Sequence, residues 1–261
     1  TQATEPASLI PLTRGTRQVV LVGDHKQLPP TVISFRAEEK GLKRSLFERL
    51  VDLGIEPLLL STQYRMHPAI SKFPNQHFYS DKLDDGINSE NRPAPAGLIW
   101  PDWDNPVAFV PVEGGEVVSP DGTSRENPSE VSWVIKILND ILDAGEITKK
   151  DIGIITPYAG QVRAIRNSMN EKLDDIEVKT VDGYQGREKE VIIFSCVRSN
   201  PEQNVGFLSE KRRLNVALTR AKRGLIVIGD PATLRGDDNW RAWLKYVRDR
   251  KFEAWHLLGM N

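Results

Sequence analysis

Short apolar runs recur along the chain, separated by longer stretches in which apolar and polar residues alternate. The runs rich in β-branched residues lie at 19–22, 58–60, 107–110, 152–156, 191–195 and 225–228. Runs of this length and composition are typical of strands that are buried on both faces of a sheet. The pattern therefore predicts several buried strands.

Helical periodicity is clearest between positions 131 and 142, where apolar residues recur at spacings of three and four. Asn127 is the predicted N-cap of this helix, with Glu130 three residues later, and Gly145 follows its last turn. Further helices are predicted at 45–53, 68–78, 160–173, 211–221 and 238–248. Strands that alternate with helices predict an α/β fold with a mostly parallel sheet, in which ligands bind at the carboxyl ends of the strands.

Two segments, at about 81–106 and 113–125, lack periodicity and have a loop-like composition. We expect both to be surface excursions from the core, and they could form one contiguous insertion around the strand at 107–110.

Composition limits the class of protein. With 261 residues and 39% hydrophobic content, the chain can form one large core or two modest ones. Its apolar runs are far shorter than the ~20 residues that cross a bilayer, so no membrane span is predicted. The single cysteine, Cys196, excludes a disulfide framework and is typical of a reducing compartment, the cytosol or the nucleus. Because the chain begins with Thr1 rather than Met and lacks a secretory signal pattern, we expect a fragment or a trimmed gene model.

The formal net charge of −1 does not by itself indicate a nucleic-acid-binding protein, so any contact with a polyanion must be local. One dense basic stretch spans residues 211–223, with apolar residues interspersed. It fits an amphipathic helix with a solvated basic face as well as it fits a phosphate contact. Composition alone leaves both interpretations open.

Polar segments lie next to the predicted strands. GDHKQLPP, at 23–30, offers Asp24 and Gln27, although a turn stabilised by Asp24 is the simpler interpretation. QYRMHP, at 63–68, places Arg65, whose donor fork suits a phosphate, beside the flat ring of Tyr64, which suits a base. Taken singly, an arginine is usually a surface charge and a tyrosine is usually half-buried packing.

Three further segments complete the set. TPYAGQ, at 156–161, puts a hydroxyl and backbone amides at a helix entrance, where they could bind phosphate or simply cap the helix. The fourth segment spans 180–200. In the fifth, at 212–224, Arg213, Asn215 and Arg220 lie on a predicted helix, from which an arginine could reach a phosphate across a cleft.

In this order and at these spacings, the segments resemble the superfamily-one helicases of the up-frameshift and senataxin type. GDHKQLPP resembles their motif III, QYRMHP motif IV, VDGYQGREKE motif V and LNVALTRAK motif VI. The opening TQATEP resembles the residues that follow the acidic Mg²⁺-binding pair of motif II. No glycine is followed by lysine and no Asp-Glu dipeptide occurs, so the phosphate-binding loop and the acidic motif are both absent.

The resemblance implies a RecA-like fold of the P-loop-NTPase type, a mostly parallel sheet with helices on both faces. Residues 1–55 would be the C-terminal tail of the first RecA-like lobe, and residues 56–261 would be the second lobe with its two excursions. ATP with Mg²⁺ would bind between the lobes, with the Mg²⁺ ligands on the missing part of the first lobe and no metal site in this chain.

The resemblance also implies roles for individual residues. The implied catalytic residues are Gln27, which would sense the γ-phosphate, and Arg65 and Arg220, which would stabilise the charge of phosphoryl transfer. Such arginine fingers are worth roughly 10³ to 10⁵ in rate, so Arg220 is expected to matter most. The implied cofactor-binding residues are Tyr64 on the adenine, Glu188 on the ribose, Gln2 and Gly186. The residues implied to face the nucleic-acid backbone are Thr156, Pro157, Tyr158, Thr180 and Gln185.

One departure from the family pattern is Glu190, which stands where an aspartate is common and whose role stays open.

The implied function is the C-terminal part of an ATP-dependent RNA or DNA helicase that couples hydrolysis to movement along a single strand. We expect a monomeric motor without a membrane partner, recruited by domains outside this chain. The main alternative is a non-catalytic nucleic-acid-binding or regulatory module, which the absent phosphate-binding loop supports. A nuclease built on carboxylates such as Asp102 and Asp121 is disfavoured because no compact acidic cluster or His/Cys metal spacing occurs. A strand gripped by its backbone does not reveal its sugar, so RNA and DNA both stay open.

Overall fold

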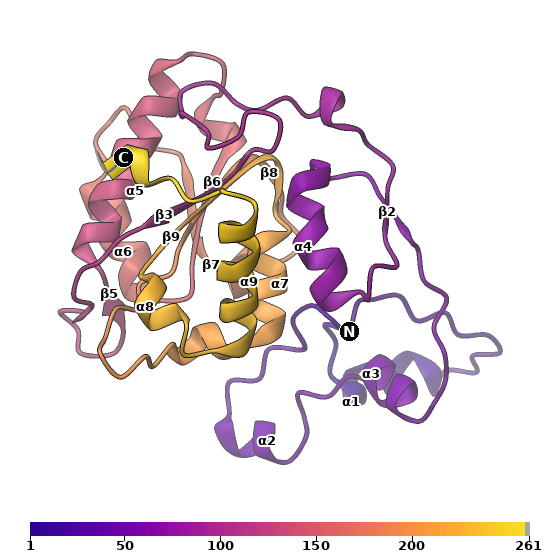
Figure 1. Ribbon diagram of the computed structural model, residues 1–261. Helices are drawn as coiled ribbons and strands as arrows, with labels where there is room; N and C mark the ends of the chain where they lie inside the picture. Colours follow the sequence, from indigo (N-terminus) through magenta and orange to yellow (C-terminus); the bar gives the residue numbers. More distant parts are fainter. Residues whose placement is uncertain (259–261) are drawn as a thin grey trace. The chain divides into compact units, whose positions relative to one another are not determined.

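The computed structural model describes residues 1–258, which form two compact units, 1–61 and the part of the chain from Thr62 onward. The domain boundary implied by the resemblance, after residue 55, lies a few residues before this division. Figure 1 shows the elements of both units.

The first unit contains three helices and no strand among its described residues: α1 (Glu5–Leu12), α2 (Phe35–Glu39) and α3 (Leu46–Asp52). The helix predicted at 45–53 is confirmed, and the Ser45 hydroxyl caps α3 by accepting from the Glu48 amide at 3.1 Å. The strands predicted at 19–22 and 58–60 are wrong: Val20 is 86% exposed and Leu58 is 99% exposed. A strand needs a neighbour for its backbone hydrogen bonds, and none is described in this unit.

The second unit is built on a five-stranded parallel sheet. Its strands are β3 (Val107–Pro111), β6 (Ile152–Thr156), β7 (Glu177–Thr180), β8 (Lys189–Ser195) and β9 (Ala221–Gly229), in the order β3-β9-β8-β6-β7. Four of them confirm the predicted apolar runs. Strand β7 was not predicted because only Val178 among its residues is buried, whereas β3, at the other edge of the sheet, is buried throughout.

Helices cover both faces of this sheet, as the fold class predicts. They are α4 (Pro68–Phe78), α5 (Pro128–Asp143), α6 (Ala159–Ser168), α7 (Lys211–Leu218), α8 (Pro231–Leu234) and α9 (Asp238–Asp249). The apolar face of α5 shares one core cluster with Ile193 of β8, whereas the adjacent Phe194 points to the other face and stacks on Trp240 of α9. Consecutive residues of a strand thus contact helices on opposite faces.

The predicted ends of α5 are confirmed. The Asn127 side chain accepts from the Glu130 amide at 3.2 Å, and Gly145 just past the last turn has φ +75°, which glycine adopts without strain. Helix α6 ends at Ser168, before the predicted limit, and α7 ends at Leu218. Arg220 therefore lies outside the helix on which it was predicted.

The segment 81–106 is not simply a surface excursion. Its Trp100 is only 2% exposed, and the indole nitrogen donates to the Pro95 carbonyl at 2.7 Å. The ring lies against Gly224 of β9, where a Cβ atom would come within 2.8 Å of it. Gly224 has no side chain and so leaves room for the Trp100 indole. The loop-like composition of 81–106 did not indicate this buried contact.

Smaller elements complete the unit. They are the parallel pair β1 (Thr62–Gln63) and β2 (Asp84–Asp85), the antiparallel pair β4 (Val117–Val118) and β5 (Arg125–Glu126), and the 3₁₀ helices η1 (Ser89–Asn91), η2 (Lys149–Asp151), η3 (Asp182–Tyr184), η4 (Gly206–Ser209) and η5 (Trp255–Leu258). No helix in the described part of the chain is long and apolar enough to cross a membrane.

Candidate functional site

The predicted nucleotide residues of the second unit meet at the amino edge of the sheet. Glu188 directly precedes β8, and Arg220 directly precedes β9. This group thus lies at the edge opposite to the carboxyl ends of the strands, where the fold leads us to expect ligands. Arg65 joins it from the segment before α4: its Nε donates to Glu188 Oε2 at 2.5 Å, and its Nη1 donates to the Thr219 carbonyl at 3.1 Å.

Glu188 is the centre of a small ion network. Its second carboxylate oxygen lies 3.3 Å from Lys222 Nζ, and Lys222 also contacts Glu190 at 3.4 Å. Partial burial would raise the pKa of Glu188, but the hydrogen bonds and charges of Arg65 and Lys222 outweigh it and lower that pKa below its ordinary value. The carboxylate therefore stays ionised at neutral pH, and Glu190, the departure from the family pattern, helps to hold Lys222.

Arg220 is buried, with 2% of its surface exposed. Its Nε donates to the Val216 carbonyl at 3.0 Å, and its Nη2 donates to the Thr219 hydroxyl at 2.9 Å. These bonds fix the guanidinium beside the carbonyl that Arg65 also contacts. The catalytic role of Arg220 stays a prediction.

Tyr64 has the exposure that a stacking residue needs, with 67% of its surface accessible. Its ring lies over Gly86, where a Cβ atom would come within 2.3 Å of the ring. Arg92 secures the backbone by donating to the carbonyls of Tyr64 and Arg65 at 3.4 and 3.1 Å. Gly186 is exposed, with φ +78°, in the connection that leads to β8.

Gln2 and Gln27 belong to the first unit. Gln2 is exposed. The Gln27 side chain donates to Asp24 Oδ2 at 2.8 Å, and the Lys26 amide donates to Asp24 Oδ1 at 2.9 Å. The turn stabilised by Asp24, which was the simpler interpretation, is thus present. The nucleotide-sensing role of Gln27 stays a prediction.

Three of the predicted nucleic-acid residues, Thr156, Pro157 and Thr180, lie at the opposite, carboxyl edge of the sheet, and Tyr158 and Gln185 follow in the adjoining connections. Thr156 ends β6, Thr180 ends β7, and the two are register partners. The Thr156 hydroxyl is buried without a hydrogen-bond partner among the described residues, and Tyr158 is only 5% exposed. Pro157, Thr180 and Gln185 are partly exposed, and the Thr180 hydroxyl accepts from the Gly183 amide at 3.3 Å.

The sequence did not predict two contacts at this edge, one between two aromatic rings and one between an aromatic ring and an arginine. Phe207 in η4 is 58% exposed, and its ring lies 5.4 Å from the Tyr158 ring. The Arg213 guanidinium lies 5.5 Å from the Phe207 ring, and its Nε contacts Asp182 at 3.1 Å. Arg213 lies in a motif that the sequence shows, whereas Phe207 could not be predicted, since a lone phenylalanine between strands gives no periodic signal.

A buried carboxylate lies beneath this edge. Glu130 is fully buried and accepts from the Ser195 hydroxyl at 2.5 Å and from the Val197 amide at 2.9 Å. Burial raises the pKa of Glu130 to about 8, although these hydrogen bonds act in the opposite direction. Burial also raises the pKa of the neighbouring Cys196 thiol. The sequence indicated only the helix-start position of Glu130.

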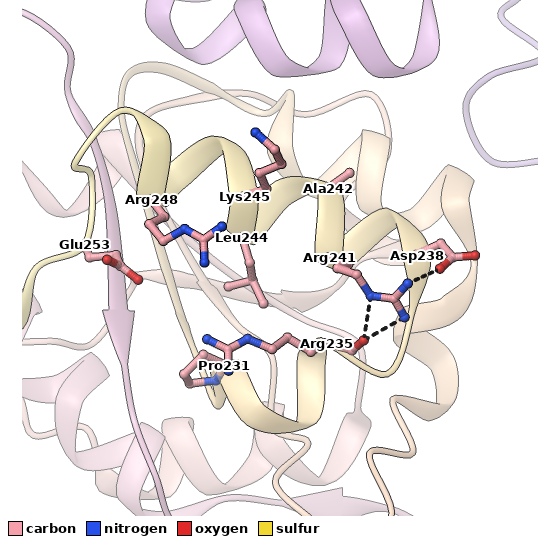
Figure 2. A pocket seen from close by; sticks show the side chains of 9 residues that line it. All are labelled: Pro231, Arg235, Asp238, Arg241, Ala242, Leu244, Lys245, Arg248 and Glu253. Atoms are coloured by element: carbon pink, nitrogen blue, oxygen red, sulfur yellow. Dashed lines mark hydrogen bonds and ion pairs between the residues drawn. The ribbon is translucent and has the colours of Figure 1, made fainter.

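One cavity of about 490 Å³ lies between α8 and α9, away from both groups. Figure 2 shows Arg241 bonded to Asp238 and to the Arg235 carbonyl. The cavity is lined by Pro231, Arg235, Asp238, Arg241, Ala242, Leu244, Lys245, Arg248 and Glu253, none of which was predicted to be a site residue. Its four cationic side chains are solvent-exposed, so it gives no support to a buried ligand site. No group of three or more His, Cys, Asp or Glu residues that could hold a metal occurs in residues 1–258.

Two family models, each described as an AAA domain, match residues 42–232 and residues 1–35. "Regulator of nonsense transcripts 1 homolog" of Drosophila melanogaster is 46% identical over 96% of the chain and 22% of its own length. "ATP-dependent helicase NAM7" of Saccharomyces cerevisiae is 44% identical over 96% of the chain and 26% of its own length. The chain thus spans about a quarter of the length of these curated relatives.

Among solved structures, "The structure of PRRSV helicase" covers 80% of the chain and 29% of that protein, with 19% identity and a TM-score of 0.37. This structural likeness is too slight to bear on function, whereas the sequence likeness extends over nearly the whole chain.

Proposed function

The chain belongs to the superfamily-one helicases of the up-frameshift type, within the AAA-domain family, and from this premise we propose that it forms the C-terminal part of an ATP-driven helicase motor. In this proposal, hydrolysis is coupled to translocation along single-stranded RNA or DNA. The protein acts as a monomer in the cytoplasm or nucleus, and other domains recruit it.

The observation that carries the proposal is the cluster at the amino edge of the sheet. Arg65 and Glu188 are 123 positions apart in sequence and form a direct ion pair, with Tyr64 exposed beside them and Arg220 bonded to the same turn. A cluster that joins a flat aromatic ring, an ionised carboxylate and two guanidinium groups suits the base, ribose and phosphates of a nucleotide.

Each side chain has a part in binding ATP. Tyr64 stacks on the base, Glu188 accepts hydrogen bonds from the ribose hydroxyls, and Arg65 moves from Glu188 to a phosphate oxygen when the nucleotide binds. Phosphoryl transfer needs positioned positive charge rather than a covalent partner, and the two arginines supply it. The resemblance implies that any Mg²⁺ that accompanies ATP takes its protein ligands from the part of the first lobe that this sequence lacks.

Strand binding uses the opposite edge of the same sheet. Thr180, Pro157 and Gln185 contact the backbone of the nucleic acid, which is gripped without sequence preference and with a strong dependence on salt. Thr180 and Glu188 lie at the two ends of one short connection, so a single segment of the chain joins the proposed strand site to the proposed nucleotide site.

The second candidate is a nucleic-acid-binding or regulatory module that does not hydrolyse ATP. The absence of a phosphate-binding loop from this sequence favours it. On this view strand binding survives, and substitutions at the amino edge have no effect on it.

The test is ATP hydrolysis by the intact protein with and without single-stranded RNA and single-stranded DNA. Arg220→Ala and Arg65→Ala are compared with the wild type, and Arg241→Ala, an exposed arginine paired with Asp238, is the matched control. We expect hydrolysis to be stimulated by one type of strand and to fall by about 10³-fold or more in both site variants. ATP binding and thermal unfolding, measured in parallel, reveal a variant that fails to fold.

Stimulated hydrolysis that Arg241→Ala retains and both site variants lose would support the motor and identify the preferred strand. A wild type that binds a strand but hydrolyses nothing would favour the binding module instead.

A further inference from the structure

Phe207 is an exposed aromatic side chain on the connection that leaves the carboxyl end of β8. More than half of its surface, 58%, is accessible. Trp103 is similarly exposed, at 54%, but no aromatic or cationic contact with its ring is recorded among the described residues. Phe207 differs because both its backbone and its ring are held in place.

The backbone of Phe207 is fixed by a buried polar chain. Its amide donates to the Tyr158 hydroxyl at 3.3 Å, and Arg198 Nη1 donates to the same oxygen at 3.3 Å. Arg198 is in turn paired with Glu116 at 2.5 Å, and both side chains are less than a tenth exposed. This network leaves the Phe207 backbone little freedom to move.

The preceding residue has to be glycine for this arrangement. Gly206 has φ +54°, and a Cβ atom there would lie 2.1 Å from Arg198 Nη1 and 2.5 Å from the Tyr158 hydroxyl. Glycine therefore lets the backbone approach Arg198 and Tyr158 more closely than a residue with a side chain would allow. This close approach sets the position of the Phe207 ring.

The ring is tied to the edge of the sheet at which we place the strand. It lies 5.4 Å from the Tyr158 ring at 39°, and the Arg213 guanidinium lies 5.5 Å from its centroid. Arg213 is paired with Asp182, the first residue of η3, which follows Thr180 by two positions. The Phe207 ring is thus connected to the region of Thr180 through Arg213 and Asp182.

We propose that Phe207 is a stacking platform for a base of the bound single strand, with Arg213 beside it as the accompanying cation. The inference rests on the proposed strand binding and adds a base contact to the backbone contacts. Single-strand-binding sites commonly combine a cationic groove with aromatic rings, because every base has a π-face on which to stack. A rigid, exposed ring next to an arginine has this composition.

The experiment compares oligonucleotides with and without bases. Binding of the intact protein to a single strand, and to an abasic strand of equal length, is measured for the wild type, Phe207→Ala, Phe207→Leu and Phe207→Trp. Leucine keeps apolar volume against Tyr158 but has no π-face, and Trp103→Ala removes an equally exposed ring elsewhere. Thermal unfolding identifies any variant that does not fold.

We expect Phe207→Ala and Phe207→Leu to weaken binding of the base-containing strand about 5- to 100-fold and to leave abasic binding unchanged. Phe207→Trp and Trp103→Ala should bind both strands as the wild type does. Wild-type affinity in the alanine and leucine variants, or equal losses on both strands, would overturn the platform while leaving strand binding intact. A wild type that binds neither strand would instead overturn the proposed function.

Discussion

Replacing Glu130 by glutamine should abolish a pH dependence of stability that the wild type has. Glu130 is fully buried, and burial raises its pKa from 4.5 to about 8. Between these two values the folded protein binds a proton that the unfolded chain does not. The stabilisation from this proton is therefore complete below about pH 4.5 and is lost as the pH rises through about 8.

The magnitude follows from proton linkage. With a folded pKa of about 8, the free energy of unfolding should fall by roughly 2.5 kcal/mol between about pH 6 and pH 8.5. In Glu130→Gln, the amide oxygen can accept from the Val197 amide, and the amide nitrogen can donate to the Ser195 hydroxyl oxygen, which in the wild type donates to Glu130 instead. The variant should keep nearly constant stability over this range.

The assay is urea unfolding at a series of pH values. Asp230 acts electrostatically on Glu130 but is present in the two proteins, so the difference between the profiles reports the Glu130 carboxyl group together with its effect on the Cys196 thiol. Glu90→Gln, which removes an exposed carboxylate and changes the net charge equally, should follow the wild type. Parallel profiles for the wild type and Glu130→Gln would refute the reasoning, since they would mean that Glu130 takes up no proton on folding.

Three substitutions test the packing around the sheet by urea unfolding. Gly153→Ala should lower the free energy of unfolding by about 1–3 kcal/mol, because a Cβ atom there would lie 1.9 Å from the Tyr184 hydroxyl. An unchanged urea midpoint would mean that the Tyr184 ring can move aside without cost. Glu116→Gln should lower the free energy of unfolding by about 3–5 kcal/mol, because it leaves the buried Arg198 charge unpaired. A decrease below ~1 kcal/mol would mean that water solvates the Arg198 guanidinium. Trp100→Ala should cost about 3–5 kcal/mol, whereas a negligible effect would restore the surface-loop interpretation of 81–106.

Four strands of the sheet could be predicted from the sequence because they are buried on both faces. Each of β3, β6, β8 and β9 contains a continuous apolar run, and burial on both faces demands such a run. Strand β7 could not be found in this way, since it buries only Val178, and a single apolar residue carries no pattern. The run at 19–22 has the right composition but no described neighbour with which to pair.

The candidate site was predictable in its parts but not in its arrangement. Motif resemblance selected Arg65 and Glu188, yet their ion pair depends on how the start of β8 lies beside the segment before α4, which no local pattern encodes. The burial of Arg220 and the buried Glu130 network depend equally on tertiary packing. Phe207 was missed for the same reason: exposure and anchoring are properties of the fold, not of the residue.

The connection from β7 to β8 limits where residues can be inserted into or deleted from the sequence. It leaves Thr180 at one edge of the sheet, passes over β6, where Tyr184 lies against Gly153, and reaches Glu188 at the other edge. Side chains along this path can be exchanged while its span is kept. An added or deleted residue would displace either the threonine or the glutamate, so natural insertions should be tolerated in the exposed loops and excluded from this segment.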